Sequence, residues 1–287
     1  MATLIVLLHV LAAMALAWYY FRHHTLARPP IGVINLTDVL VMMVSIVVLP
    51  YLYLIAPSWL IAGLLGLGAL GLVQITLEPL VQPRWAGWLV TFALIVADGG
   101  SAWRLGAASV AHQAINNVVM LIMVVGITNL WVQSGIRARD VALLAAMLTL
   151  YDFLFTTQLP LMTELFRRLA GMPFAMQVAW SADFGATFSA IGLGDLLFTA
   201  VFPLVMHKAF GRRAGILAFA LGFAAVAGLD AALWLTDTHR FFPAMVVLGP
   251  LMVAQYLFWI QRRRRERATG EYLAAEPRSG ALIHANP

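Results

Sequence analysis

Apolar residues occur in long runs that recur along almost the whole chain, and short polar or basic segments separate them. A helix that spans a bilayer needs roughly 20 mainly apolar residues, whereas the strands of a membrane barrel alternate apolar and polar positions. The pattern therefore predicts an all-α membrane protein with nine transmembrane helices. The predicted spans are residues 2–21, 37–56, 59–77, 85–102, 112–131, 139–159, 184–206, 214–235 and 241–260.

The spans form one predicted transmembrane domain, residues 1–267, and the polar tail that follows, 268–287, is expected to be disordered and cytoplasmic. The connections are short except for residues 160–183, which suit either an amphipathic interfacial helix or an ordinary connector. Composition agrees with a membrane protein, because 62% of the 287 residues are apolar and only 11% are charged. A soluble domain of this size could not cover that much apolar surface.

Basic residues are distributed unevenly between the two ends of the predicted spans. With the N-terminus outside, the inner connections and the end of the last span hold 13 of the 18 Lys and Arg residues, and the outer connections hold four. Cytoplasmic connections carry the excess of basic residues. We therefore expect an integral multi-pass protein with its N-terminus outside and its C-terminus in the cytoplasm. The first segment has no basic residue before it and Arg22 after it, which favours a retained anchor over a cleaved signal peptide.

Several kinds of site are excluded or unsupported by the composition. The chain has no cysteine, so disulfides, thiolate metal sites and cysteine nucleophiles are absent. Its seven histidines show no spacing typical of a metal site, and no metal or cofactor is expected. The net charge of +5 lies in connections and in the run from Arg262 to Arg267, where it serves membrane orientation. We therefore expect no nucleic-acid partner.

Two acidic residues lie well inside predicted spans. Asp152 follows Thr-Leu-Tyr and precedes Phe-Leu-Phe in the sixth span, and Asp195 follows Ile-Gly-Leu-Gly in the seventh. A carboxylate within a bilayer is costly and marks a functional site by default. Because the two spans are consecutive and antiparallel, the two acids can lie at one depth. Asp98 and Asp230 are also partly within spans, but we interpret them as caps or buried pairs near helix ends.

Two neighbouring carboxyls cannot both ionise cheaply, so such a pair shares one proton. One member can then take a proton from an attacking water, while the other donates a hydrogen bond to the carbonyl oxygen of a peptide. Gly192 and Gly194 precede Asp195 and would permit close approach of another backbone. The residues thus indicate an aspartyl dyad that needs no metal.

The motifs around these acids resemble those of the presenilin and signal-peptide-peptidase family of GxGD intramembrane aspartyl proteases. Tyr151-Asp152 resembles the YD motif of its sixth span, and Gly192-Leu193-Gly194-Asp195 resembles the GxGD motif of its seventh. Pro243-Ala244-Met245, at the start of the ninth span, resembles its PAL motif with Met in place of Leu. The resemblance covers the C-terminal half of the chain and implies a presenilin-like fold in a short, prokaryote-like homologue.

The resemblance implies a role for each motif. Asp152 and Asp195 would be the catalytic pair, in a catalytic unit over residues 139–260. Tyr151 and the segment Gly192-Leu193-Gly194 would support it, with Tyr151 either hydrogen-bonding near the dyad or only packing. The segment from Pro243 to Met245 would help to hold an unwound substrate. The expected partners are the lipid bilayer and a transmembrane peptide or protein.

The expected orientation is that of the signal-peptide-peptidase branch, so we expect cleavage of segments whose N-terminus is cytoplasmic, as in type II anchors. If the source is prokaryotic, the location would be the plasma membrane. Three alternatives remain open. The paired acids could serve a proton- or cation-coupled transporter or channel. The GxGD motif also occurs in prepilin-peptidase-like enzymes, although Leu196-Leu197-Phe198 follows it here. A structural helper without activity is the third.

Overall fold

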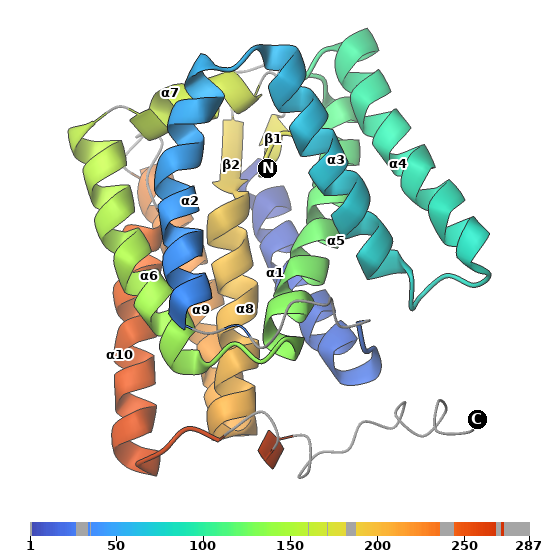
Figure 1. Ribbon diagram of the computed structural model, residues 1–287. Coiled ribbons are helices and arrows are strands. Elements are labelled where there is room, and N and C mark those ends of the chain that lie inside the picture. Colours follow the sequence, from blue (N-terminus) through green and yellow to red (C-terminus); the bar gives the residue numbers. More distant parts are fainter. Residues whose placement is uncertain are drawn as a thin grey trace.

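The computed structural model describes residues 2–26, 34, 36–159, 161–170, 172–181, 188–235, 244–267 and 271–272 of the chain. Its helices run side by side in one bundle, with a small sheet near one end (Figure 1). The elements are α1 Ala2–His23, α2 Leu36–Ile55, α3 Ser58–Leu77, α4 Arg84–Leu105, α5 Val110–Gln133, α6 Ala138–Asp152, the π-helix η1 Phe153–Gln158, α7 Leu161–Ala170, β1 Gln177–Ser181, β2 Phe188–Gly192, α8 Leu193–Phe210, α9 Arg212–Leu235 and α10 Met245–Arg263.

Seven of the described helices are long and apolar enough to cross a membrane, namely α1 to α5, α8 and α9. The chain is thus a multi-pass membrane protein. The other two predicted spans coincide with α6, which has 15 residues and continues into η1, and with α10, which has 19. A total of nine spans stays a prediction.

The predicted seventh span, residues 184–206, begins too early, because the segment Phe188–Gly192 is the strand β2 and the helix starts only at Leu193. The prediction of an all-α protein is therefore incomplete. The strands β1 and β2 form one antiparallel pair, in which Gln177 lies opposite Gly192 and Ala179 lies opposite Ala190. These strands were missed because their apolar residues continue the pattern of the neighbouring span. Pairing along the backbone decides their conformation.

Two asparagines of α5 hold this hairpin in place. The amide of Asn117 donates to the carbonyl of Ala179 at 2.9 Å, and its oxygen accepts from the Ala179 N–H at 3.0 Å. The amide of Asn116 donates to the carbonyls of Ala175 and Gln177 at 3.1 and 3.0 Å. Both side chains thus satisfy backbone groups of β1 and of the residues just before it, which would be costly to leave unpaired within a bundle of membrane-spanning helices.

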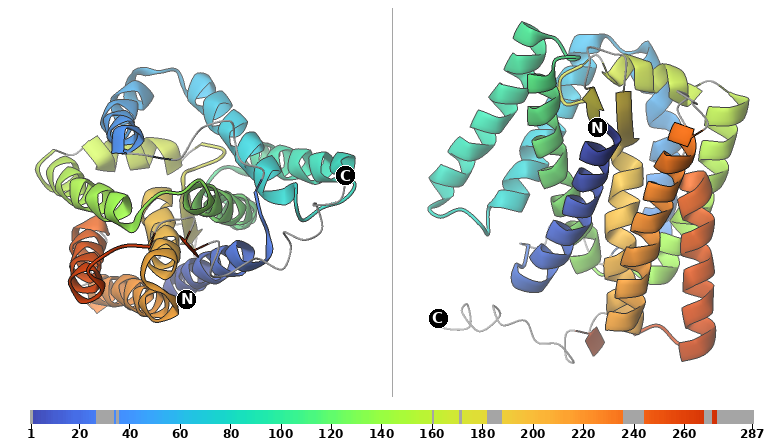
Figure 2. Two further views of the ribbon diagram at one scale, coloured as in Figure 1. Left: turned by 60° about the horizontal axis from the view of Figure 1, so that its bottom comes forward. Right: turned by 180° about the vertical axis from the view of Figure 1, so that it is seen from behind.

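Helix α8 is the centre of the bundle. Every residue from Leu196 to Phe210 is buried, and the helix packs against α1, α5, α6, α9 and α10 (Figure 2). Gly215 of α9 permits part of this packing, since a Cβ there would lie 2.6 Å from the Cβ of His207. The core of the bundle therefore fixes the helix that carries Asp195.

The long connection contains the amphipathic helix α7, one of the two alternatives for residues 160–183. Leu165 and Leu169 of α7 are buried, whereas Glu164 and Arg167 are exposed and form an ion pair. Arg168 donates to the carbonyls of Leu54 and Ala56, at the end of α2, the second at 2.5 Å. Helix α7 is therefore tied to α2 as well as to the hairpin that follows.

The predicted disordered tail lies mostly outside the described residues, but one part of the prediction is wrong. Tyr272 is buried, and its ring stacks on Phe21 of α1 with the centroids 5.8 Å apart. The Arg267 guanidinium lies 5.7 Å from the centre of the same ring. The chain thus turns back under the bundle after α10, which brings aromatic side chains together that are distant in sequence.

Candidate active site

Three helix ends meet at the two intramembrane acids. Asp152 is the last residue of α6, Asp195 lies in the first turn of α8, and Met245 is the first residue of α10. The charge of Asp152 acts on Asp195, and the backbone N–H of Met245 lies near both carboxyl groups. The structure therefore brings together one residue from each of the three motifs.

Helix starts supply partial positive charge at this site. The first N–H groups of a helix have no partner within the helix, and its dipole places about half a positive charge there. Both α8 and α10 begin beside the pair, and the Gly192 cap of α8 makes no side-chain hydrogen bond. A negative charge on Asp152 or Asp195 would therefore be stabilised by these backbone dipoles.

Helices α6 and α10 are held at a fixed height relative to one another near the acids. The hydroxyl of Thr149 donates to the carbonyl of Ala145 at 2.8 Å and to the carbonyl of Met245 at 3.1 Å. Gly249 allows this approach, because a Cβ there would lie 2.7 Å from the Ala145 carbonyl oxygen and would overlap the Thr149 hydroxyl. The carbonyl of Met245 therefore accepts from Thr149, and its N–H lies near the carboxyl groups of Asp152 and Asp195.

The GxGD segment joins the hairpin to α8. Gly192 ends β2 and Leu193 begins α8, and the N–H of Leu193 donates to the carbonyl of Met176 at 2.9 Å. A Cβ on Gly192 would lie 3.5 Å from the carboxyl of Asp195, an ordinary contact. Gly194 is exposed, and no atom lies within 4 Å of the position that its Cβ would take. The side of Asp195 next to Gly194 is thus open.

Tyr151 is buried with 5% of its surface exposed. Its ring lies 4.6 Å from that of Phe155, which in turn meets the edge of Tyr51 at 6.4 Å. The packing role considered for Tyr151 is therefore present, and a hydrogen bond near the dyad stays a prediction. Ala244 and Met245 are both buried, and the Ala244 carbonyl accepts from the N–H of Leu248 as α10 begins.

Pro243, the first residue of the third motif, lies outside the described residues. The other two acids within predicted spans, Asp98 of α4 and Asp230 of α9, lie beside the hairpin segment. Asp98 is fully buried and accepts from the N–H of Phe174 at 2.9 Å, just before β1. Asp230 of α9 lies near the side chain of Ser189 in β2. Both acids thus lie beside the hairpin segment, and their role as caps or buried pairs stays a prediction.

Sequence reasoning missed two residues that shape the site. Thr149 lies one helical turn before Asp152, and the only signal for it is that its hydroxyl interrupts an apolar helix face. Glu266 accepts from the N–H groups of Ala138 and Arg139 at the start of α6, 128 and 127 residues away in the chain. A contact at such a separation leaves no trace in the local pattern. Among the described residues, no cluster of His, Asp or Glu could hold a metal ion.

Comparisons with known proteins give one kind of match. No protein-family model matches the chain, and no curated protein matches it. Among solved structures, that of a presenilin family intramembrane aspartate protease matches with a TM-score of 0.59 and 12% sequence identity. The match covers 91% of this chain and 99% of that one. The fold of this chain is therefore the fold of a presenilin-family intramembrane aspartate protease.

Proposed function

We propose that the chain is an intramembrane aspartyl endopeptidase with Asp152 and Asp195 as its catalytic pair. The observation that carries the proposal is that Asp152 and Asp195 lie close enough to interact, beside the start of α10, within a bundle of membrane-spanning helices. Two neighbouring acids can share a proton and exchange roles during a reaction. The presenilin-like fold supports the same assignment.

The arrangement suits peptide hydrolysis in two steps. One carboxylate removes a proton from a water molecule while the water oxygen bonds to the scissile carbonyl carbon. The neutral carboxyl gives its proton to the carbonyl oxygen. The tetrahedral intermediate then breaks its C–N bond as the carbonyl group re-forms. The departing amine takes the proton that the first carboxyl gained, and the second carboxylate takes a proton back from a hydroxyl of the intermediate, which restores the starting state of the pair. The N-termini of α8 and α10 would balance the one negative charge of the pair throughout.

The substrate segment would be extended at the point of cleavage, because a helix buries the carbonyl that must be attacked. Within the described part of the chain, β2 pairs only with β1, and β2 leads directly to Asp195. An extended peptide along the free edge of β2 would therefore pass the dyad with its backbone groups satisfied. The motif residues Ala244 and Met245 would bound this path.

The test uses purified protein and a synthetic peptide of one transmembrane segment, with products identified by mass spectrometry. We expect cleavage by the wild type and none by Asp152→Asn or Asp195→Asn, because an amide can neither take up nor give the proton. Both variants should keep the wild-type melting temperature in detergent. Substantial cleavage by a folded variant would remove that residue from the catalytic pair.

We further propose the signal-peptide-peptidase orientation, with substrates whose N-terminus is cytoplasmic. The support is electrostatic, since Arg22, Arg137, Lys208, Arg212 and the run that starts at Arg262 all belong to one end of the bundle, the basic end. Model substrates that carry one apolar segment in both orientations test this. Preferential cleavage of the substrate with its N-terminus outside would contradict it.

A transporter would also need paired acids, but it would give no role to the start of α10, which lies beside both of them. Flux and proteolysis can be separated in liposomes. If protons or cations leaked through the wild type but not through Asp195→Asn, and no peptide were cleaved, the alternative would be preferred.

A further inference from the structure

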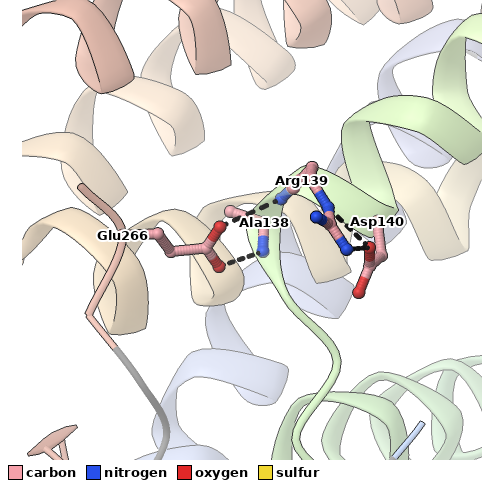
Figure 3. Close-up of polar contacts among 4 residues, drawn as sticks. All are labelled: Ala138, Arg139, Asp140 and Glu266. Carbon is pink, nitrogen blue, oxygen red and sulfur yellow. Dashed lines mark hydrogen bonds and ion pairs between the residues drawn. The ribbon is translucent and has the colours of Figure 1, made fainter. Parts of the chain in front are cut away.

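Glu266 and Arg267, the last two residues of the run from Arg262 to Arg267, contact the ends of both acid-bearing helices. Glu266 accepts from the N–H of Ala138 at 2.7 Å and from that of Arg139 at 3.4 Å, at the start of α6 (Figure 3). The next residue, Arg267, donates through its guanidinium to the carbonyl of His207 at 3.0 Å and through its backbone to that of Ala209 at 3.2 Å, at the end of α8.

The Glu266 contact replaces a cap that α6 lacks. The residue before α6, Arg137, has the extended backbone of a capping residue but makes no side-chain cap, so the carboxylate of Glu266 takes that place. The guanidinium of Arg267 adds a second donor to the carbonyl of His207, which also accepts from the N–H of Gly211 at the end of α8, where positive charge is favourable. Both contacts come from one dipeptide, which joins two helices that are distant in sequence.

Other charged groups surround the junction. Lys208 is 2% exposed, interacts with the charge of Glu266, and donates to the carbonyls of Val132 and Ile136 at 3.1 and 2.6 Å, in the last turn of α5 and just after it. Arg139 pairs with the buried Asp140 at 3.2 Å within the first turn of α6. The half-buried Glu266 thus lies near the buried Lys208 and the buried Asp140.

Helices α6 and α8 are antiparallel, and they are fixed at both ends. At one end Asp152 and Asp195 meet at Met245, and at the other end Glu266 and Arg267 join the same two helices. Helix α10 connects these points, because it begins at Met245 and ends three residues before Glu266. A shift of α6 along α10 would therefore have two effects at once. It would break the Glu266 contacts at one end, and it would move Asp152 away from Met245 at the other.

From this geometry we infer that Glu266 is a positioning residue for the dyad, which sets the height of α6 against α10 and α8. The inference rests on the proposed protease function. The contact of Glu266 has two parts to play: it caps the start of α6, and it also joins α6 to the end of α10, which keeps Asp152 in position. A misplacement of about 1 Å at reacting groups can lower a rate by about 100-fold. Loss of the tether should therefore lower kcat and leave KM nearly unchanged.

The experiment separates the tether from the cap. We expect Glu266→Ala to lower kcat by about tenfold or more, and Glu266→Gln to keep most activity because its amide oxygen still accepts from Ala138. The double variant Glu266→Ala with Arg137→Ser supplies a local cap at the start of α6. It should recover the melting temperature but not kcat. Glu271→Ala, which removes the exposed partner of Arg265, is the matched control and should match the wild type.

A second measurement does not depend on cleavage. The chain has no cysteine, so spin labels can be placed only at Leu143 on α6 and Leu257 on α10, both exposed. We expect Glu266→Ala, with or without Arg137→Ser, to shift or broaden the distance distribution between the labels. If the double variant recovered kcat, or if Glu266→Ala left both kcat and the label distance unchanged, the inference would be overturned. If the wild type cleaved nothing while the label distance still responded to Glu266, the protease proposal would fail and the positioning role would stand.

Discussion

The hydroxyl of Thr149 on α6 donates a hydrogen bond to the carbonyl of Met245, the first residue of α10, over 3.1 Å. The N–H of the same Met245 lies near Asp152 and Asp195. One side-chain hydrogen bond therefore holds the first residue of α10 against α6 beside both acids. Changes to this bond should alter the chemistry more than the stability.

We predict that Thr149→Val lowers kcat several-fold and the free energy of unfolding by about 1 kcal/mol, the usual net contribution of one hydrogen bond. Valine keeps the shape of threonine and removes only the donor. Thr149→Ser keeps the donor and should retain wild-type activity. Peptide cleavage and melting in detergent measure both effects, and equal kcat for Val and wild type would show that Met245 is oriented without Thr149.

We predict that Gly249→Ala destabilises the protein by about 1–3 kcal/mol, the usual cost of forcing an extra group into a packed contact. The added methyl would meet the Ala145 carbonyl oxygen at 2.7 Å and would push α6 away from α10. Gly63→Ala is the control, since no atom lies within 4 Å of its Cβ position. Thermal melting compares the two, and equal melting temperatures would show that α6 and α10 can separate freely.

We predict that Gly194→Leu abolishes most cleavage, whereas Gly71→Leu leaves it near the wild-type level. The two glycines are matched, because both are exposed and neither Cβ position has an atom within 4 Å. Neither change should therefore cost much packing, and a difference in activity reports access to Asp195. Activity of Gly194→Leu close to that of Gly71→Leu would mean that substrate approaches from another side.

We predict that the wild type loses melting temperature relative to Glu266→Gln as the pH rises from about 4, near the pKa of an unfolded glutamate. Burial raises the pKa of Glu266 in the fold. The charge of Asp140 adds to the rise, and the Ala138 and Arg139 amides and Lys208 oppose it. Stability from a group with a raised pKa is fully present below the unfolded value and is lost as the pH rises through the folded one. A difference that stayed constant with pH would contradict the prediction.

Most of the helices could be predicted from the sequence, and the two acids could be singled out as candidates, because both signals are local. A run of apolar residues defines a span by itself, and an acid such as Asp152 or Asp195 is conspicuous within such a run. The meeting of the two acids could be expected from consecutive antiparallel spans. The boundaries of α4 were also close, although Gly99 and Gly100 follow Asp98 inside that helix.

The features that the sequence did not predict depend on contacts between distant segments. Strand β2 has the apolar character of a helix, and only its partner β1 and the Asn117 contacts to that partner select an extended backbone. Glu266 looks like one more charge in a basic run until α6 is placed beside it. Such contacts are absent from local periodicity, so they appear only when the helices are assembled.

The direct passage from β2 into α8 has a mechanical consequence. Gly192 is the last residue of the strand and Leu193 the first of the helix, so no slack separates the hairpin from Asp195. A slip of one residue in the pairing of β2 would move the backbone by about 3.3 Å along the strand, and the carboxyl would travel with it. The pairing register of the hairpin thus sets the position of the Asp195 carboxyl. Inserting one glycine between Gly192 and Leu193 would decouple the strand from the helix. A peptide could then still bind along β2, but the carboxyl of Asp195 would no longer be held at a fixed position relative to that peptide.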